Sequence, residues 1–286
     1  MRVLVVLAAL FLAAFLLGCG ASVTTDQEVQ TGAGSMTVDP AASTDGGTDG
    51  YVYIPTMSPA ARQASAIISA EPTPSGGYKA AAEVLVSCAP LAGGQSRQAL
   101  TTTTDAYGYF LFIDLTAGTY MISVTGATPV NVTVVAGSLT HPDGKQSVLP
   151  PGFRAIFVDL SVMGSWPQLR EMLKDVNWIR VGFTSDNPNA TALAFNLYMG
   201  DVPSGEIVSG PRTAALIQDL PLPSGADNPH TFNLGDINIA MTQQIKDLVF
   251  GGRFWLYGWV EPAPTSPVII SDIQVRLSLK IGQDIL

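Results

Sequence analysis

The sequence predicts an all-β protein, with two antiparallel β-sandwich domains in tandem after a signal segment and a flexible tether. Three observations lead to this fold class. Short runs of alternating apolar residues recur at close intervals, Gly-rich and Pro-rich turns separate them, and few stretches have helical spacing. The chain has 286 residues, 47% of them hydrophobic and 13% charged, which provides enough apolar material for two domain cores.

Residues 1–18 have the architecture of a secretory signal peptide. Arg2 precedes an uninterrupted apolar run over residues 3–17, which is shorter than the ~20 residues that a spanning helix needs. Leu16-Leu17-Gly18-Cys19 follows this run and resembles the lipobox of bacterial lipoproteins. The resemblance implies cleavage before Cys19, acylation of that cysteine with palmitate-type chains, and anchoring in the bacterial cell envelope. An ordinary signal peptide with a chance cysteine, or a signal anchor, remains the alternative.

Two further expectations concern the start of the mature chain. Gly20, rather than Asp, follows the cysteine, and the lipoprotein resemblance then implies the outer membrane. Residues 19–58 are predicted to form a lipidated flexible tether, because small and polar residues dominate and no apolar periodicity appears. Asp45 and Asp49 lie among glycines but lack the distal Glu of a calcium loop, so no metal site is expected there.

Residues 59–150 are predicted to form the first sandwich. A signature in this segment has the pattern TD-x-x-G-x-F-x-F-x-x-L-x-x-G-x-Y, and it consists of Thr104, Asp105, Gly108, Phe110, Phe112, Leu115, Gly118 and Tyr120. It resembles the carboxypeptidase regulatory-like domain, a transthyretin-like β-sandwich. The resemblance implies an accessory binding or spacer module without catalytic residues. Physically, Asp105 and Gly108 suit a turn, and the alternation of Phe110 and Phe112 directs both rings into one core.

Residues 151–286 are predicted to form a second β-sandwich with short helices. Strands are expected over residues 155–162, 178–184, 192–198, 231–239, 253–260 and 269–281, and helices over 167–176 and 242–249. The turn Asn187-Pro188-Asn189 resembles that of strand-rich domains of the late-embryogenesis-abundant type. Trp166 and Trp178 are expected to pack in the core or at its rim.

No sequence pattern indicates a catalytic, metal or cofactor site. His141 and His230 lie beside prolines without a second ligand at metal-binding spacing, so each is expected to be a solvated loop residue. No G-x-S-x-G elbow, Walker loop or H-E-x-x-H pattern occurs. Trp255, Tyr257 and Trp259 share one face of a strand. The sequence favours core packing for these rings over an exposed platform that stacks on sugars.

The functional expectation follows from the signal and the charge. With 14 basic and 23 acidic residues the net charge is −9, which argues against nucleic acid as a partner. The sequence predicts a non-enzymatic lipoprotein without cofactors that is anchored through Cys19 and offers a structural or protein-binding surface. Its expected partners are the membrane, through the N-terminal lipid, and another envelope protein or an extracellular polymer. The alternatives are a glycan-binding lipoprotein that uses Trp255, Tyr257 and Trp259, and an enzyme with a loop-built site.

Overall fold

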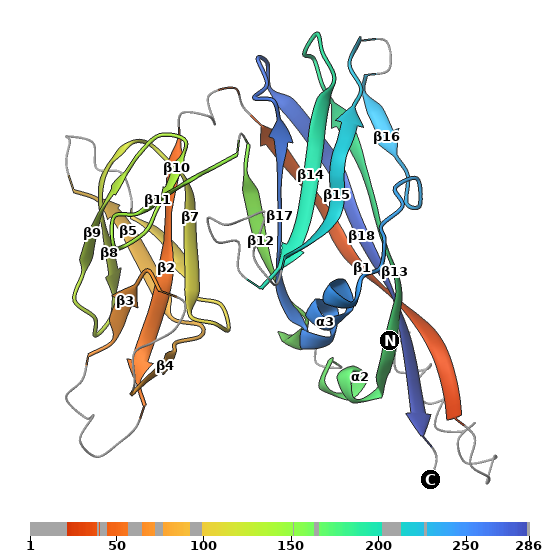
Figure 1. The fold of residues 1–286 in the computed structure, drawn as a ribbon, viewed down its shortest axis with the longest axis horizontal. Coiled ribbons are helices and arrows are strands. Elements are labelled where there is room, and N and C mark those ends of the chain that lie inside the picture. The colour runs from red at the N-terminus through yellow and green to blue at the C-terminus, as the bar shows by residue number, and fades with distance from the viewer. Residues whose placement is uncertain are drawn as a thin grey trace.

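The computed structural model confirms the all-β prediction, with strands in four sheets that pack as two sandwiches (Figure 1). Residues 1–21, which include the predicted signal peptide and Cys19, lie outside the described residues. No helix in the described part of the chain is long and apolar enough to cross a bilayer. The structure describes residues 22–38, 40, 45–56, 65–71, 77–91, 99–150, 152–162, 166–201, 213–225 and 228–284.

The first sandwich consists of two sheets. One has the order β11-β10-β2-β3, with β4 and β7 also paired to β2. Its strands are β2 (Gly46–Pro55), β3 (Ile67–Ser69), β4 (Tyr78–Ala80), β7 (Tyr109–Leu115), β10 (Ser138–Thr140) and β11 (Gln146–Val148). The facing sheet has the order β6-β5-β8-β9 and contains β5 (Leu85–Pro90), β6 (Leu100–Thr103), β8 (Gly118–Val124) and β9 (Val130–Val134).

The structure of the turn before β7 gives the physical reason for Thr104 and Gly108 in the signature. The Thr104 hydroxyl donates to the carbonyl oxygen of Ala81 at 2.5 Å and accepts from the backbone N–H of Val84 at 2.9 Å. Gly108 has a φ of 76°, and a Cβ at this position would lie 2.5 Å from the carbonyl oxygen of Val52. Only glycine fits both the backbone conformation and the close approach.

The core of the first sandwich contains aromatic residues of the signature. Phe110 and Phe112 of β7 are buried together, as predicted, and Tyr120 of β8 packs in the same core from the facing sheet. Cys88 lies in the same core with 1% of its surface exposed. Burial raises the pKa of the Cys88 thiol to about 12, because the thiolate would lose its hydration. Cys88 is therefore a buried small hydrophobe.

The second sandwich also consists of two sheets, with short helices between the strands. One sheet has the order β1-β18-β13-β16, with β1 (Ser22–Val38), β13 (Leu173–Asp186), β16 (His230–Phe232) and β18 (Val268–Asp284). The other has the order β12-β17-β14-β15, with β12 (Arg154–Asp159), β14 (Leu193–Gly200), β15 (Thr213–Leu222) and β17 (Arg253–Glu261). The helices are the 3-10 turn η3 (Leu160–Val162), α2 (Trp166–Met172) and α3 (Gln243–Gly251).

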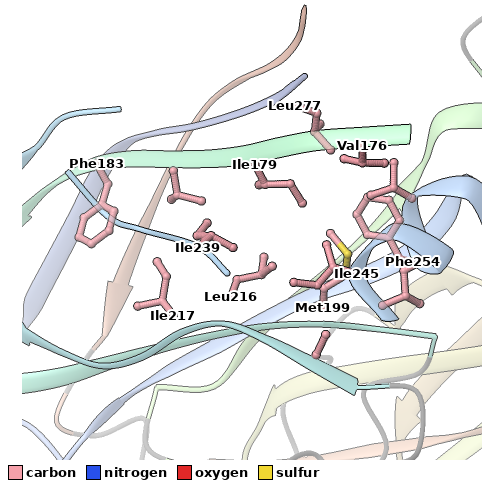
Figure 2. Packing of buried hydrophobic residues seen from close by; sticks show 14 of the residues in the cluster. Val176, Ile179, Phe183, Met199, Leu216, Ile217, Ile239, Ile245, Phe254 and Leu277 are labelled. Carbon is pink, nitrogen blue, oxygen red and sulfur yellow. The ribbon is translucent and has the colours of Figure 1, made fainter. Parts of the chain in front are cut away.

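The core of the second sandwich lies between these two sheets. Figure 2 shows Ile179 and Phe183 of β13 across from Leu216 and Ile217 of β15. Ile245 of α3 belongs to the same buried cluster. Helix α3 lies where it was predicted. Its N-terminus is capped by the side chain of Thr242, which accepts a hydrogen bond from the backbone N–H of Ile245.

Two predicted elements are shorter in the structure. The helix expected over residues 167–176 ends at Met172, and β13 begins at Leu173, which pairs with Ile281 of β18. Here the long β18 partner overrides the helical spacing of the sequence, because tertiary pairing outweighs weak local propensity. The strand expected over residues 231–239 ends at Phe232, where the chain turns.

The flexible tether predicted over residues 19–58 is wrong for most of that segment. β1 pairs antiparallel with β18 from Ser22 opposite Asp284 to Val38 opposite Val268. β2 forms the centre of the larger sheet in the first sandwich, where it pairs with β3, β4, β7 and β10. Partners from far along the chain satisfy the backbone groups of both strands, so low hydrophobicity does not leave these residues as coil.

The two sandwiches are consequently nested in the chain and do not follow each other in tandem. The chain starts the second sandwich with β1, builds the first from β2 to β11, and returns to the second at β12. The boundaries predicted at 59–150 and 151–286 therefore miss β2 in the first unit and β1 in the second. The sheets are also not wholly antiparallel, since β10 pairs parallel with β2.

Removal of β1 tests this corrected topology. A chain that begins at residue 45 should melt on the order of 10 °C or more below a chain that begins at residue 22, because it loses the β1–β18 ladder and leaves β18 as an open edge. Thermal unfolding followed by circular dichroism measures the difference. Equal melting temperatures for the two chains would contradict the pairing of β1 with β18 and support a flexible tether.

Candidate functional site

The sequence predicted two sites, a lipidation site and an aromatic strand face. Cys19, the predicted lipidation site, lies outside the described residues. Trp255, Tyr257 and Trp259 do share one face of β17, but they are only 9%, 1% and 4% exposed. A sugar ring cannot stack on side chains that protein atoms already cover. The alternative of an exposed aromatic platform is therefore wrong. The three rings are buried, as the sequence favoured.

These rings belong to an aromatic cluster that joins the two sandwiches. Its buried members from the first sandwich come from β2 and β7, and those from the second come from β14, β17 and the chain before β12. They are Tyr51, Tyr53, Tyr109, Phe153, Tyr198, Trp255, Tyr257 and Trp259. Tyr109 meets Trp255 edge-on with centroids 5.7 Å apart, and Tyr198 stacks on Trp259 at 4.9 Å. The interface is packed like a third core.

Asp105 of the signature links the sandwiches by a hydrogen bond. One carboxylate oxygen accepts the backbone N–H groups of Tyr107 and Tyr109, at 2.8 and 2.9 Å, and so holds the turn before β7. The other accepts the indole N–H of Trp255 at 2.8 Å. Burial raises the pKa of Asp105, and these hydrogen bonds partly oppose that shift. A residue predicted to make only a turn therefore also fastens one domain to the other.

His141 is not the solvated loop residue that the sequence suggested. Its Nδ1 lies 2.5 Å from Oδ1 of Asp49, and the second oxygen of Asp49 accepts the hydroxyl of Tyr109 at 2.8 Å. The Asp49 side chain is 3% exposed and that of His141 is 18% exposed. The hydrogen bond to Asp49 is the main reason why the pKa of His141 is raised. His230 lies on β16, where its ring contacts Phe232.

Ser147 extends this arrangement on the other side of the imidazole. Its hydroxyl oxygen lies 3.0 Å from Nε2 of His141. A carboxylate only accepts hydrogen bonds, so the neutral imidazole places its proton on Nδ1 toward Asp49 and leaves Nε2 to accept from Ser147. The order carboxylate, imidazole, hydroxyl is that of a serine nucleophile with its base.

The fold brings the three residues together through the larger sheet of the first sandwich. The parallel pairing of β10 with β2 places Thr140 opposite Thr48, one residue before His141 and Asp49. The antiparallel pairing of β10 with β11 returns Ser147 to the same end of the sheet. Gly50 permits the contact, because a Cβ there would lie 2.9 Å from Cγ of Pro142.

Sequence reasoning missed this cluster, although one signal pointed to part of it. Asp143-Gly144 is a hairpin turn sequence, and it predicts that the residues on either side pair. That pairing would have placed His141 and Ser147 at one end of a hairpin. Asp49 carried no comparable signal, since it is separated from His141 by 92 positions and lay in the predicted tether. Within the described ranges, no three or more His, Cys, Asp or Glu residues gather as metal ligands.

Comparisons with known proteins do not assign the chain to a family. No protein-family model matches it, and no curated protein matches it. It is similar to the infectious bursal disease virus VP2 subviral particle, with 8% identity and a TM-score of 0.21 over 92% of this chain and 72% of that chain. For the T13 particle of that virus the identity is 9% and the TM-score 0.13, over 92% and 77% of the respective chains. TM-scores this low carry no argument about fold or function.

The Asp105–Trp255 hydrogen bond can be tested by a change that keeps the ring. Trp255→Phe should lower the free energy of unfolding by about 1–3 kcal/mol, because it leaves a buried carboxylate oxygen without its donor. Trp259→Phe is the matched control. Its indole N–H reaches only an exposed carboxylate, that of Glu261, at 3.3 Å, so it should cost less. Urea unfolding measures both variants, and equal losses would contradict the assigned link.

The His141–Asp49 pair predicts a pH dependence of stability. Because Asp49 raises the pKa of His141 above 6.5, the pair stabilises the fold fully below that value. The contribution is lost as the pH rises through the native pKa of His141. An NMR titration should show a larger fall of this pKa in Asp49→Asn than in Asp143→Asn, since Asp143 is a weaker cause. Equal pKa values in the wild-type protein and Asp49→Asn would refute the assignment.

Proposed function

We propose that this chain is a lipid-anchored protein of the bacterial cell envelope, in which Cys19 carries the lipid and the two sandwiches form a structural or protein-binding module. The observation that carries the proposal is the sequence Leu16-Leu17-Gly18-Cys19 directly after an apolar run of signal-peptide length. Two or three acyl chains on one residue would hold the protein stably on a membrane. Gly20 favours the outer membrane as the site of anchoring.

The fold changes how the anchored protein would stand on the membrane. Only Gly20 and Ala21 separate Cys19 from the start of β1. Ser22 pairs with Asp284, so this end of the β1–β18 ladder would lie close to the lipid headgroups. The first sandwich branches from the far end of β1, and Figure 1 shows it beside the second sandwich. The aromatic interface supports a rigid two-domain body, because it fixes one sandwich against the other.

The partners in this proposal follow from charge and surface. A net charge of −9 disfavours anionic lipid and nucleic acid as additional partners. Another envelope protein or an extracellular polymer then remains as the partner of the exposed faces. Glycan binding through Trp255, Tyr257 and Trp259 is not retained, since the three rings are buried.

Metabolic labelling tests the anchor. The wild-type chain should incorporate a palmitate analogue, whereas Cys19→Ala should lose the label and accumulate with residues 1–18 uncleaved. Cys88→Ala is the matched control and should keep the label, because Cys88 lies in the core. Normal processing and undiminished label in Cys19→Ala would disprove the lipid anchor.

A second candidate function is an enzyme with a loop-built site, an alternative that the sequence left open. One observation favours it. Hydrogen bonds join the side chain of Asp49 on β2 to that of His141, and His141 to that of Ser147, beside the turn of the β10–β11 hairpin. This activity would be additional to the anchored module and would not replace it.

A further inference from the structure

We infer that Ser147, His141 and Asp49 form an acyl-transfer site that hydrolyses small carboxylic esters. Ser147 would be the nucleophile, His141 its general base, and Asp49 the group that orients the imidazole. The distances that carry this assignment are 3.0 Å from Ser147 Oγ to His141 Nε2 and 2.5 Å from His141 Nδ1 to Asp49 Oδ1. Both lie within the range expected for a nucleophile, its base and the group behind the base.

The carboxylate is the most buried of the three side chains, as such a site requires. Asp49 is almost fully buried, and its second oxygen is occupied by the Tyr109 hydroxyl, so the carboxylate is fixed. His141 and Ser147 are both partly exposed. The imidazole and the hydroxyl are therefore open to a substrate from solvent, while the carboxylate behind them is closed off.

β11 gives the substrate a place to approach. It is the end strand of its sheet and pairs only with β10 among the described strands. The bonds His141 N–H to Lys145 O and Leu149 N–H to Gly137 O show which residues of the hairpin face β10. By the alternation of an antiparallel ladder, the N–H groups of Gln146 and Val148 point to the open edge. Because two residues of a strand span about 6.8 Å, one of these donors beside Ser147, not both together, is available to a carbonyl oxygen that becomes negative.

The charge of the neighbouring surface favours a neutral substrate. Nearby charge is mixed, with Lys145 paired to Asp143 at 2.9 Å and more distantly to Glu71 at 3.7 Å. The charges that the described residues place beside Ser147 are paired, which suits a neutral ester, whereas an anionic substrate would approach the buried Asp49 carboxylate.

The reaction is balanced with water as the only co-reactant. Ser147 Oγ bonds to the carbonyl carbon of the ester while its proton moves to Nε2 of His141. The bond from that carbon to the alkoxy oxygen then breaks, and the alcohol leaves with the proton from Nε2. Water attacks the acyl-serine ester, His141 accepts a proton from it, and the carboxylic acid leaves as Ser147 recovers its proton. The sum is ester plus water giving acid plus alcohol.

A fluorophosphonate probe and p-nitrophenyl acetate test the assignment on the full chain purified in detergent. The probe phosphonylates a serine only when a base activates it, and mass spectrometry locates the label. We expect label on Ser147 in the wild-type protein and in Ser138→Ala, a matched change on the adjacent strand β10. Ser147→Ala should lose both the label and the release of nitrophenolate. His141→Gln should label about a hundredfold more slowly, since a general base contributes that much or more.

Three results would overturn the proposal. They are no label on Ser147 of the folded wild-type protein, equal labelling rates in His141→Gln and the wild-type protein, and wild-type hydrolysis by Ser147→Ala. Circular dichroism confirms that each variant is folded. Should His141→Gln fail to fold, the pH profile of the wild-type protein decides instead. Its labelling rate must rise through the pKa of His141 found by NMR, and a flat profile rejects the site. Failure of the palmitate test at Cys19 would leave this proposal standing.

Discussion

The burial of one shared aromatic face holds this molecule together. Tyrosines of β2 and β7 share one buried cluster with Trp255, Tyr257 and Trp259 of β17, and the edge-on pair of Tyr109 with Trp255 adds about 0.5–1.5 kcal/mol beyond the burial of its area. The Trp255 indole N–H cannot be left unpaired in such an interface, and Asp105 supplies the acceptor. Because Asp105 also holds the turn before β7, the interface and the fold of the first sandwich depend on the same carboxylate.

The same sheet face positions the candidate site. Asp49, Tyr51 and Tyr53 alternate on β2 and face the second sandwich, while Val52 faces the core of the first. Asp49 stands at the end of this aromatic row, where it is too buried for water to solvate it. Tyr109 and His141 take the place of water as its donors. A buried carboxylate with two fixed donors keeps the imidazole in one orientation, as general-base catalysis would require.

Local patterns predicted a large part of the fold. The alternation of Phe110 and Phe112 correctly assigned the core face of β7, because the period of two depends only on strand geometry. The same approach failed for β1, whose residues satisfy their backbone groups through a strand at the other end of the chain. It failed for His141 for the same reason, since its partner Asp49 belongs to a strand that was not predicted.

The sequence by itself determined the all-β class and the position of most strands of the second sandwich, and it carries the lipobox-like segment on which the proposed anchor rests. These properties depend on residue type and on neighbours a few positions away. Only the tertiary structure decided that one sandwich is inserted into the other, that three aromatic rings are buried between them, and that Asp49, His141 and Ser147 meet. The physical reason is that these contacts, apart from that of His141 with Ser147, join residues tens to hundreds of positions apart. Their pairing is fixed by sheet register and by the packing of whole domains, and no local pattern encodes it.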